Sequence, residues 1–153
     1  MPNFVLDTGI VLGYFLKTHY AEDIEENIKP FKSPNTAIIC IVTKGEILSI
    51  SKQRHWGSGK IESLEQLLAT IPSVDISDER VINSYAEIDA YSQGKLTSNP
   101  LPDGMSSRNM GKNDIWIAAI AHTTKATLLT TDGDFDHLNR VYFPLIRFDP
   151  TKK

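Results

Sequence analysis

Hydrophobic and polar residues follow one another along the chain in blocks that predict short buried strands separated by helices. Unbroken apolar runs of strand length are typical of parallel sheets, because helices cover both faces of such a sheet. Pro72 lacks a backbone N–H and therefore places its strand at a sheet edge. The predicted strands are Asn3–Leu6, Thr36–Ile41, Pro72–Ile76, Thr127–Thr130 and Leu145–Phe148.

Apolar residues at helical spacing predict the segments between these strands to be helices. The run from Ile115 to Ala121 is apolar at every position, which is typical of a helix buried on all sides. The predicted helices are 8–16, 21–29, 43–56, 61–70, 79–91 and a last one that opens at Asp114.

Strands that alternate with helices predict an α/β fold, a three-layer α/β/α sandwich around a mostly parallel sheet of four or five strands. A chain of 153 residues fits a single domain, here 1–148, followed by a frayed polar tail at 149–153. The segment from Gln93 to Lys112 has no periodicity, and its length indicates either a functional flap or a disordered insert.

The composition of the chain limits the binding partners and the cellular compartment that we expect for it. The net charge of −3 gives no general basic field, so a nucleic acid would need local Lys and Arg or a metal ion. The single cysteine, Cys40, lies in an apolar run and is expected to be a buried hydrophobe in a reducing cytosol. The chain passes from Met1 directly into a predicted strand and has no membrane-length apolar run, which predicts a cytoplasmic protein.

Four carboxylates far apart in the sequence are candidates for one site. Asp7 and Asp132 each follow a predicted strand, and ligand sites of such sheets lie at the carboxyl ends of the strands. Asp114 opens a helix that returns to the same edge, and Glu46 lies in the first turns of another helix on a partly apolar stripe. Alone, Asp114 would be a helix N-cap and Asp132 a turn residue. Together they predict one acidic cleft, provided that the first and fourth strands are neighbours.

The segments that carry these acids resemble, in order, the motifs of the PIN-domain ribonucleases, most closely the VapC-type toxins of toxin–antitoxin pairs. The motifs are Leu6–Thr8, Thr43–Ile47, Lys112–Ala119 and Thr130–Phe135. The resemblance implies that Asp7, Glu46, Asp114 and Asp132 are catalytic metal ligands, that Thr8 and Thr130 support them, and that Asp134 is an auxiliary acid. It further implies an RNA substrate, a homodimer and a small cognate antitoxin.

Carboxylates that share a cleft repel one another, and a divalent cation relieves the repulsion. Oxygen ligands without a Cys or His cluster favour one or two Mg²⁺ or Mn²⁺ ions over Zn²⁺. Such ions support in-line hydrolysis, which predicts cleavage of single-stranded or loop RNA to a 5′-phosphate and a 3′-hydroxyl. The candidate guides for the RNA backbone are Lys44, Arg108, Lys112 and His137.

Other families share fragments of this pattern. Leu6–Gly9 resembles the catalytic triplet of the aspartic proteases. Those proteases have an all-β fold, and the apolar helix after Asp114 argues against it. A toprim site would place Glu where Asp7 stands, and a haloacid-dehalogenase phosphatase would need a second Asp where Gly9 stands. Two alternatives remain open: an RNA-processing nuclease that is not a toxin, and a catalytically silent RNA-binding or scaffold protein with the same fold.

Overall fold

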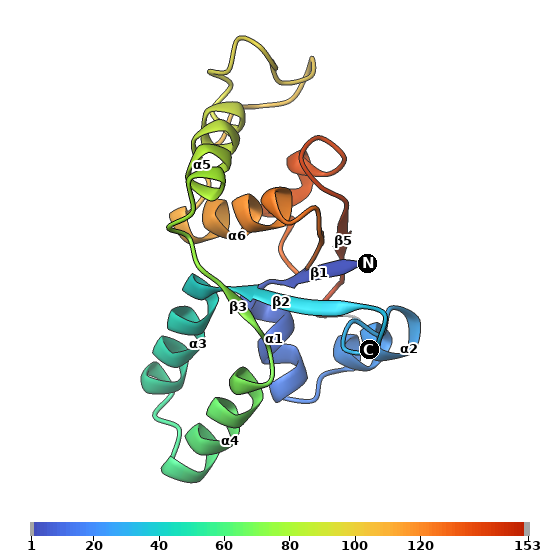
Figure 1. The fold of residues 1–153 in the computed structure, drawn as a ribbon, viewed down its shortest axis with the longest axis vertical. Coiled ribbons are helices and arrows are strands. Elements are labelled where there is room, and N and C mark those ends of the chain that lie inside the picture. Colours follow the sequence, from blue (N-terminus) through green and yellow to red (C-terminus); the bar gives the residue numbers. More distant parts are fainter. Residues whose placement is uncertain (1, 152–153) are drawn as a thin grey trace.

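Five parallel strands form one sheet in the computed structural model, which describes residues 2–151, and the strand order is β3-β2-β1-β4-β5 (Figure 1). The α/β prediction is therefore confirmed. The short β3 lies at an edge, as Pro72 predicted. The strands are β1 (Asn3–Leu6), β2 (Thr36–Cys40), β3 (Ser73–Val74), β4 (Thr127–Thr130) and β5 (Leu145–Arg147).

Helices cover both faces of the sheet, with α5 and α6 on one side and the other helices on the opposite side (Figure 1). They are α1 (Thr8–Phe15), α2 (His19–Asn27), α3 (Ile41–Gln53), α4 (Ser58–Ala69), α5 (Glu79–Ser92) and α6 (Lys112–Thr123). A short 3-10 helix, η1 (Gly133–Leu138), replaces the simple turn expected there. None of the helices in residues 2–151 is long and apolar enough to cross a membrane.

Successive residues of the strands enter two separate hydrophobic cores, because side chains alternate across a sheet. Val5 and Leu128 face the core under α5 and α6, whereas Leu6 and Leu129 face the core under α1 to α4. Burial of apolar surface on both faces stabilises the sheet by about 25 cal/mol per Å². Cys40 is fully buried in the first of these cores, as its apolar surroundings predicted.

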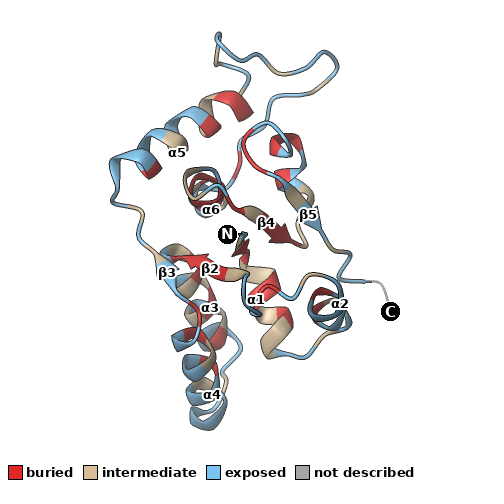
Figure 2. Cartoon of the chain, turned by 45° about the vertical axis from the view of Figure 1, so that its right-hand side comes forward, coloured by how far each residue is buried: buried red, intermediate tan, exposed pale blue. Residues whose placement is uncertain are grey.

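Helix α6 is apolar on all sides because it lies between the sheet and α5 (Figures 1 and 2). Five consecutive residues, 117–121, are completely inaccessible to solvent. The prediction that Asp114 caps this helix is wrong. The N-cap is Gly111, whose extended backbone precedes the first helical residue, so Asp114 is the third residue of the first turn.

Strands β1 and β4 are direct neighbours, which was the condition for a shared cleft. The backbone N–H of Asp7 donates to the carbonyl of Leu129 at 3.0 Å. Helix α1 then starts against the end of β4, where a Cβ on Gly9 would lie 2.8 Å from Oγ1 of Thr131. Only glycine permits this approach without a shift, so the closeness of the two strand ends depends on Gly9.

The segment 93–111 contains no helix or strand, as its sequence predicted. At the other end of the chain, the backbone N–H of Thr151 donates to the carboxylate of Asp149 at 2.9 Å. The rest of the predicted tail, residues 152–153, lies outside the described residues, as does Met1.

Candidate metal centre and active site

Asp7 is the most deeply buried of the candidate acids, with 6% of its surface exposed. It follows β1 and caps α1, so its Oδ1 accepts from the backbone N–H of Thr8 at 2.7 Å. Its Oδ2 accepts from Oγ1 of Thr130 at 2.6 Å. Burial raises the pKa of Asp7, and the negative charges of Glu46 and Asp132 add to the increase, while the two hydrogen bonds oppose it.

Two threonine hydroxyls tie the ends of the sheet and α3 together. Oγ1 of Thr8 donates to Oε1 of Glu46 at 2.8 Å, which fixes this partly buried α3 carboxylate beside α1. Oγ1 of Thr130 donates to Asp7 and also accepts from the backbone N–H of Asp132 at 3.0 Å. These contacts are those expected of residues that hold a carboxylate site in place.

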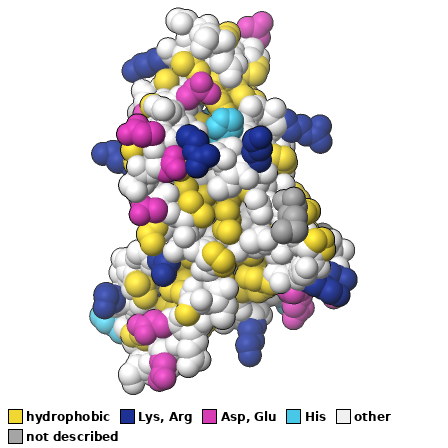
Figure 3. All heavy atoms as spheres, in the orientation of Figure 1, with side chains coloured by type: hydrophobic (Ala, Val, Ile, Leu, Met, Phe, Trp, Pro, Cys, Tyr) yellow, Lys and Arg dark blue, Asp and Glu magenta, His cyan; other side chains and the backbone are white. Residues whose placement is uncertain are grey.

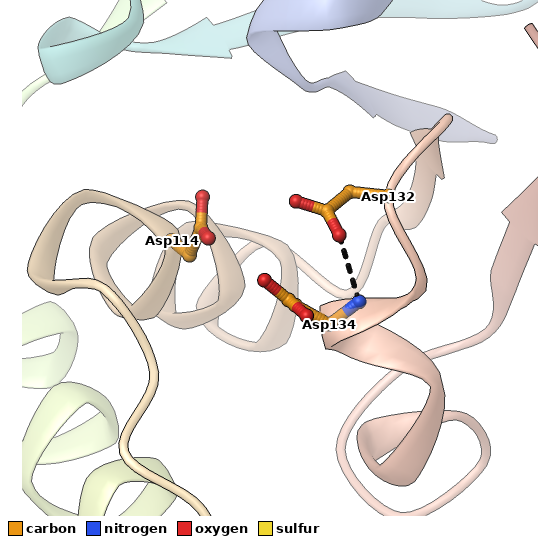
Figure 4. Close-up of side chains that lie close together, drawn as sticks. All are labelled: Asp114, Asp132 and Asp134. Carbon is orange, nitrogen blue, oxygen red and sulfur yellow. Dashed lines mark hydrogen bonds between the residues drawn. The ribbon is translucent and has the colours of Figure 1, made fainter.

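Asp132 and Asp134 lie on the turn that leads from β4 into η1. Oδ1 of Asp132 accepts from the backbone N–H of Asp134 at 2.9 Å, and Asp132 is the N-cap of η1. The same turn brings the carboxylate of Asp134 to the Asp132 side of the cleft (Figure 4). Gly133 between them lies under the Arg147 guanidinium, since a Cβ there would be 2.5 Å from Nη1.

Asp114 faces this pair from the first turn of α6 (Figure 4). One carboxylate oxygen from each of Asp114, Asp132 and Asp134 lies within 4.8 Å of the other two. Burial, and after it the charges of the surrounding carboxylates with Asp7 first, together raise the pKa of Asp114 from 3.8 to about 7. The carboxylate is thus held in a place that favours its neutral form unless a cation is added.

The structure gathers the acids in two groups rather than in one ring of four. Asp114, Asp132 and Asp134 form the close trio, whereas Asp7 and Glu46 lie outside it and are held through the threonines. All five still share one electrostatic environment, because the four others all contribute to the raised pKa of Asp114. Asp134, expected only as an auxiliary acid, lies inside the trio.

The residues present fit a divalent cation with hard ligands. In residues 2–151, none of the five carboxylates forms an ion pair with Lys, Arg or His. All the donor atoms in the trio are carboxylate oxygens, the ligands preferred by Mg²⁺ and Mn²⁺. A cation at this place would offset the mutual repulsion that raises the pKa of Asp114.

Pockets extend from the acids on more than one side. One of about 410 Å³ is lined by Glu46, Lys112 and Asp114. A second, of about 530 Å³, runs along α3 and shares Glu46 with the first. The lining of this second pocket was not predicted from the sequence, although Gly45, Ser49 and Gln53 recur at helical spacing and so mark one face of α3.

The candidate guides for the substrate have different positions. Lys112 lies at the start of α6 beside Asp114, Arg108 lies in the insert beside Asp134, and Lys44 is partly buried in α3. His137 cannot contact a substrate, so that prediction is wrong. Only 5% of the surface of this residue is exposed, and its Nε2 lies 2.7 Å from Oγ of Ser92 on α5.

The chain matches the family model for the PIN domain over residues 4–141, and it therefore belongs to the PIN-domain family. This confirms the family that the four motifs indicated. A search of curated proteins gives no match.

Several solved structures share the fold at low sequence identity. VapBC2 from Rickettsia felis, bound to a DNA fragment from its promoter, aligns with a TM-score of 0.71 and 19% identity over 96% of this chain and 99% of that chain. VapBC-1 from nontypeable Haemophilus influenzae aligns with a TM-score of 0.67 and 18% identity over 95% of this chain and 97% of that chain. VapBC-5 from Mycobacterium tuberculosis is a member of the VapBC family of toxin–antitoxin systems. It aligns with a TM-score of 0.62 and 21% identity over 97% of this chain and 100% of that chain.

Proposed function

We propose that the protein is a metal-dependent endoribonuclease and the toxin of a toxin–antitoxin pair. The observation that carries the proposal is the trio of Asp114, Asp132 and Asp134, with Asp7 and Glu46 close enough to raise the pKa of Asp114, and with no cationic partner for any of the five in residues 2–151. A fold maintains such repulsion at a cost in stability, which is typical of functional sites. Membership of the PIN family and the likeness to VapBC structures support the same function.

In this proposal Asp114, Asp132 and Asp134 hold one or two Mg²⁺ or Mn²⁺ ions, with Asp7 and Glu46 completing the ligand set. When bound, such an ion supplies a Lewis acid for the phosphate and lowers the pKa of water. The hydroxyls of Thr8 and Thr130 fix the carboxylates of Glu46 and Asp7, so that these need not reorganise during the reaction.

The reaction is hydrolysis by in-line attack of water on phosphorus. The bond from phosphorus to the 3′-oxygen breaks, and the proton lost by the water is finally taken up by that oxygen. The products are a 5′-phosphate and a 3′-hydroxyl. Lys112, which lines the same pocket as Asp114, is placed to neutralise a phosphate beside the acids.

Cleavage of a labelled single-stranded RNA by the purified protein tests the proposal. We expect cleavage with Mg²⁺ or Mn²⁺, none in EDTA, and a loss of about 100-fold or more in Asp114→Asn and Asp132→Asn, as for removal of a key electrostatic group. Asp23→Asn, on the exposed face of α2, is the matched control and should cleave like the parent. If the parent cuts no RNA while Asp114→Asn binds metal and RNA equally well, the protein is a silent RNA-binding member of the family.

The toxin role adds two expectations, a homodimer and a small antitoxin that covers the cleft. Sedimentation of the purified protein should give twice the monomer mass. A short open reading frame beside the gene should encode a protein that binds this chain and blocks its RNA cleavage. Cleavage without growth inhibition on expression, and without such a neighbour, would instead favour an RNA-processing nuclease.

A further inference from the structure

The segment 93–111 (the insert) leaves α5 and returns to α6 beyond the end of α5, where Figure 1 draws it in yellow. Its returning part is fixed to the buried layer beneath it. The backbone N–H of Arg108 donates to the carbonyl of Ser92 at 2.8 Å, and Met110 is buried with its sulfur 3.4 Å from Oγ of Ser92. The same Ser92 hydroxyl contacts His137 of η1.

This anchoring connects the insert to the element that carries Asp134. Ser92 and His137 are both buried, and they join α5 to η1 directly under residues 106–110. The returning part of the insert therefore has a set position beside the acidic cluster, although it contains no regular structure. His137 thus contributes to this arrangement through its buried contact with Ser92.

Two small pockets lie on the insert, one after the other. The first, of about 260 Å³, is bordered by Asp134 of the acidic trio and by residues 106–110. The second, of about 230 Å³, is lined by Gln93, Lys95 and residues 107–109. Ser107, Arg108 and Asn109 line both pockets, and Arg108 is the cation among these three. The pockets thus form a path that starts at the trio and leads away from it.

The chemistry of this path suits a polyanion with hydrogen-bonding bases. Arg108 and Lys95 are exposed, and neither forms an ion pair with any carboxylate of residues 2–151. The rest of the walls consists of amide and hydroxyl side chains, together with Met110 and Asp134 in the first pocket. Each pocket is smaller than the roughly 300 Å³ at which small-molecule sites begin, so successive units of an extended chain fit better than one compact ligand.

The positive charge of this path is local. Figure 3 shows charged side chains of both signs scattered over the face seen in Figure 1, without a continuous basic patch. The net charge is −3, and the pocket along α3 on the other side of Glu46 is lined by no Lys or Arg. Beyond Lys112 at the acids themselves, an RNA drawn toward them therefore finds its cationic contacts on the insert side.

We propose that the insert binds the RNA on one side of the cleavage point. The pocket bordered by Asp134 takes the nucleotide next to the scissile phosphate, the pocket bordered by Lys95 takes the following nucleotide, and Arg108 binds the phosphate that connects them. This assignment rests on the proposed nuclease function and adds the place and length of its substrate contact. The guanidinium of Arg108 also offers a plane on which an unpaired base can stack.

The test compares Arg108→Gln and Lys95→Gln with the parent on a single-stranded RNA of about ten nucleotides and on a dinucleotide, both with Mg²⁺ or Mn²⁺. We expect kcat/KM for the longer RNA to fall about fivefold or more in each variant, and to fall less for the dinucleotide, which does not reach the pocket bordered by Lys95. Lys32→Gln is the matched control, because this exposed lysine precedes β2 and so lies at the opposite end of the sheet. Thermal unfolding confirms that each variant is folded.

Binding of the longer RNA in EDTA gives a second measurement that needs no catalysis. The salt dependence of the association constant should lose about 0.7 in log–log slope for each phosphate contact removed. Parent-like binding and cleavage by both variants overturns the assignment and leaves the proposed function standing, and so does an equal loss on the dinucleotide. If the parent binds RNA through these residues but cleaves none, the nuclease proposal fails, and the assignment is reduced to RNA binding by the insert without a cleavage point.

Discussion

Replacement of Asp114 by asparagine should stabilise the protein when no metal is bound. The pKa of Asp114 rises from 3.8 to about 7 on folding, because burial and four neighbouring carboxylates oppose its ionisation. For a fully buried group this difference corresponds to about 4 kcal/mol. Asp114 is only partly buried, and solvent screening reduces the penalty to roughly half, ~2 kcal/mol. The asparagine avoids this penalty at neutral pH.

The substitution also removes a stabilising interaction of Asp114 with the helix dipole, but this loss is smaller than the gain. An acid in the first turn of a helix interacts favourably with the helix dipole, and its loss costs about 0.3–1 kcal/mol. The net gain is therefore about 1 kcal/mol, which raises the melting temperature of a domain of this size by about 2–4 °C. Asp23→Asn, which removes an exposed charge from α2, should leave the melting temperature within a degree or so of the parent.

The pH dependence of stability shows whether ionisation of Asp114 causes the difference between the parent and the variant. Because the folded-state pKa of Asp114 lies above the unfolded-state value, the stability contributed by the protonated carboxyl is complete below about pH 3.8 and is lost as the pH rises through 7. In EDTA, parent and Asp114→Asn should therefore melt together near about pH 4, and the variant should be the more stable near about pH 8.

Addition of Mg²⁺ or Mn²⁺ near about pH 8 should make the parent more stable than Asp114→Asn. A metal at 100 times its dissociation constant stabilises the parent by about 2.7 kcal/mol, and the variant should gain much less. Melting curves by differential scanning calorimetry or fluorescence give the melting temperatures of the parent and of Asp114→Asn, each in EDTA and with the metal. A variant that is less stable than the parent in EDTA at about pH 8 would refute the claim that Asp114 is ionised against its surroundings.

Four further predictions concern the supports of the site and the core. Thr130→Val removes a buried donor to a carboxylate and should lower the free energy of unfolding in urea by about 2–3 kcal/mol, so an unchanged midpoint would contradict this role. Gly9→Ala should destabilise by about 1–3 kcal/mol through its contact with Thr131. Gly45→Ala, which meets no atom within 4 Å inside α3, should stabilise by about 1 kcal/mol, and equal effects of the two glycine substitutions would be inconsistent with this reasoning. The thiol of Cys40, whose pKa burial raises to about 11, should resist Ellman's reagent until guanidinium unfolds the chain, and fast labelling of the native protein would argue against its burial.

The layers of this fold could be predicted from the sequence because each depends on local periodicity. Unbroken apolar runs marked β1, β2 and β4, and the all-apolar stretch of α6 required cover on both sides, which α5 and the sheet supply. Pro72 placed β3 at the edge. These features need no knowledge of loop geometry, which is why they agree with the structure.

The arrangement inside the candidate site depends on geometry that spacing does not determine. The inclusion of Asp134 in the trio follows from the turn into η1, and that short 3-10 helix has no sequence period to mark it. His137 was expected to guide RNA, but it is buried in contact with Ser92 of α5, which is 45 residues away in the sequence and which only the fold brings to it. Asp114 lies two residues inside its helix because Gly111 caps it.

Titration of Mn²⁺ into the metal-free protein, followed by calorimetry or by the electron paramagnetic resonance signal of the free ion, tests the central claim most directly. The parent should bind one or two ions, and Asp114→Asn and Asp132→Asn should each weaken that binding about tenfold or more, while Asp23→Asn should not. Binding that is absent in the parent, or equally strong in all four proteins, would contradict a metal centre at the carboxyl ends of β1 and β4.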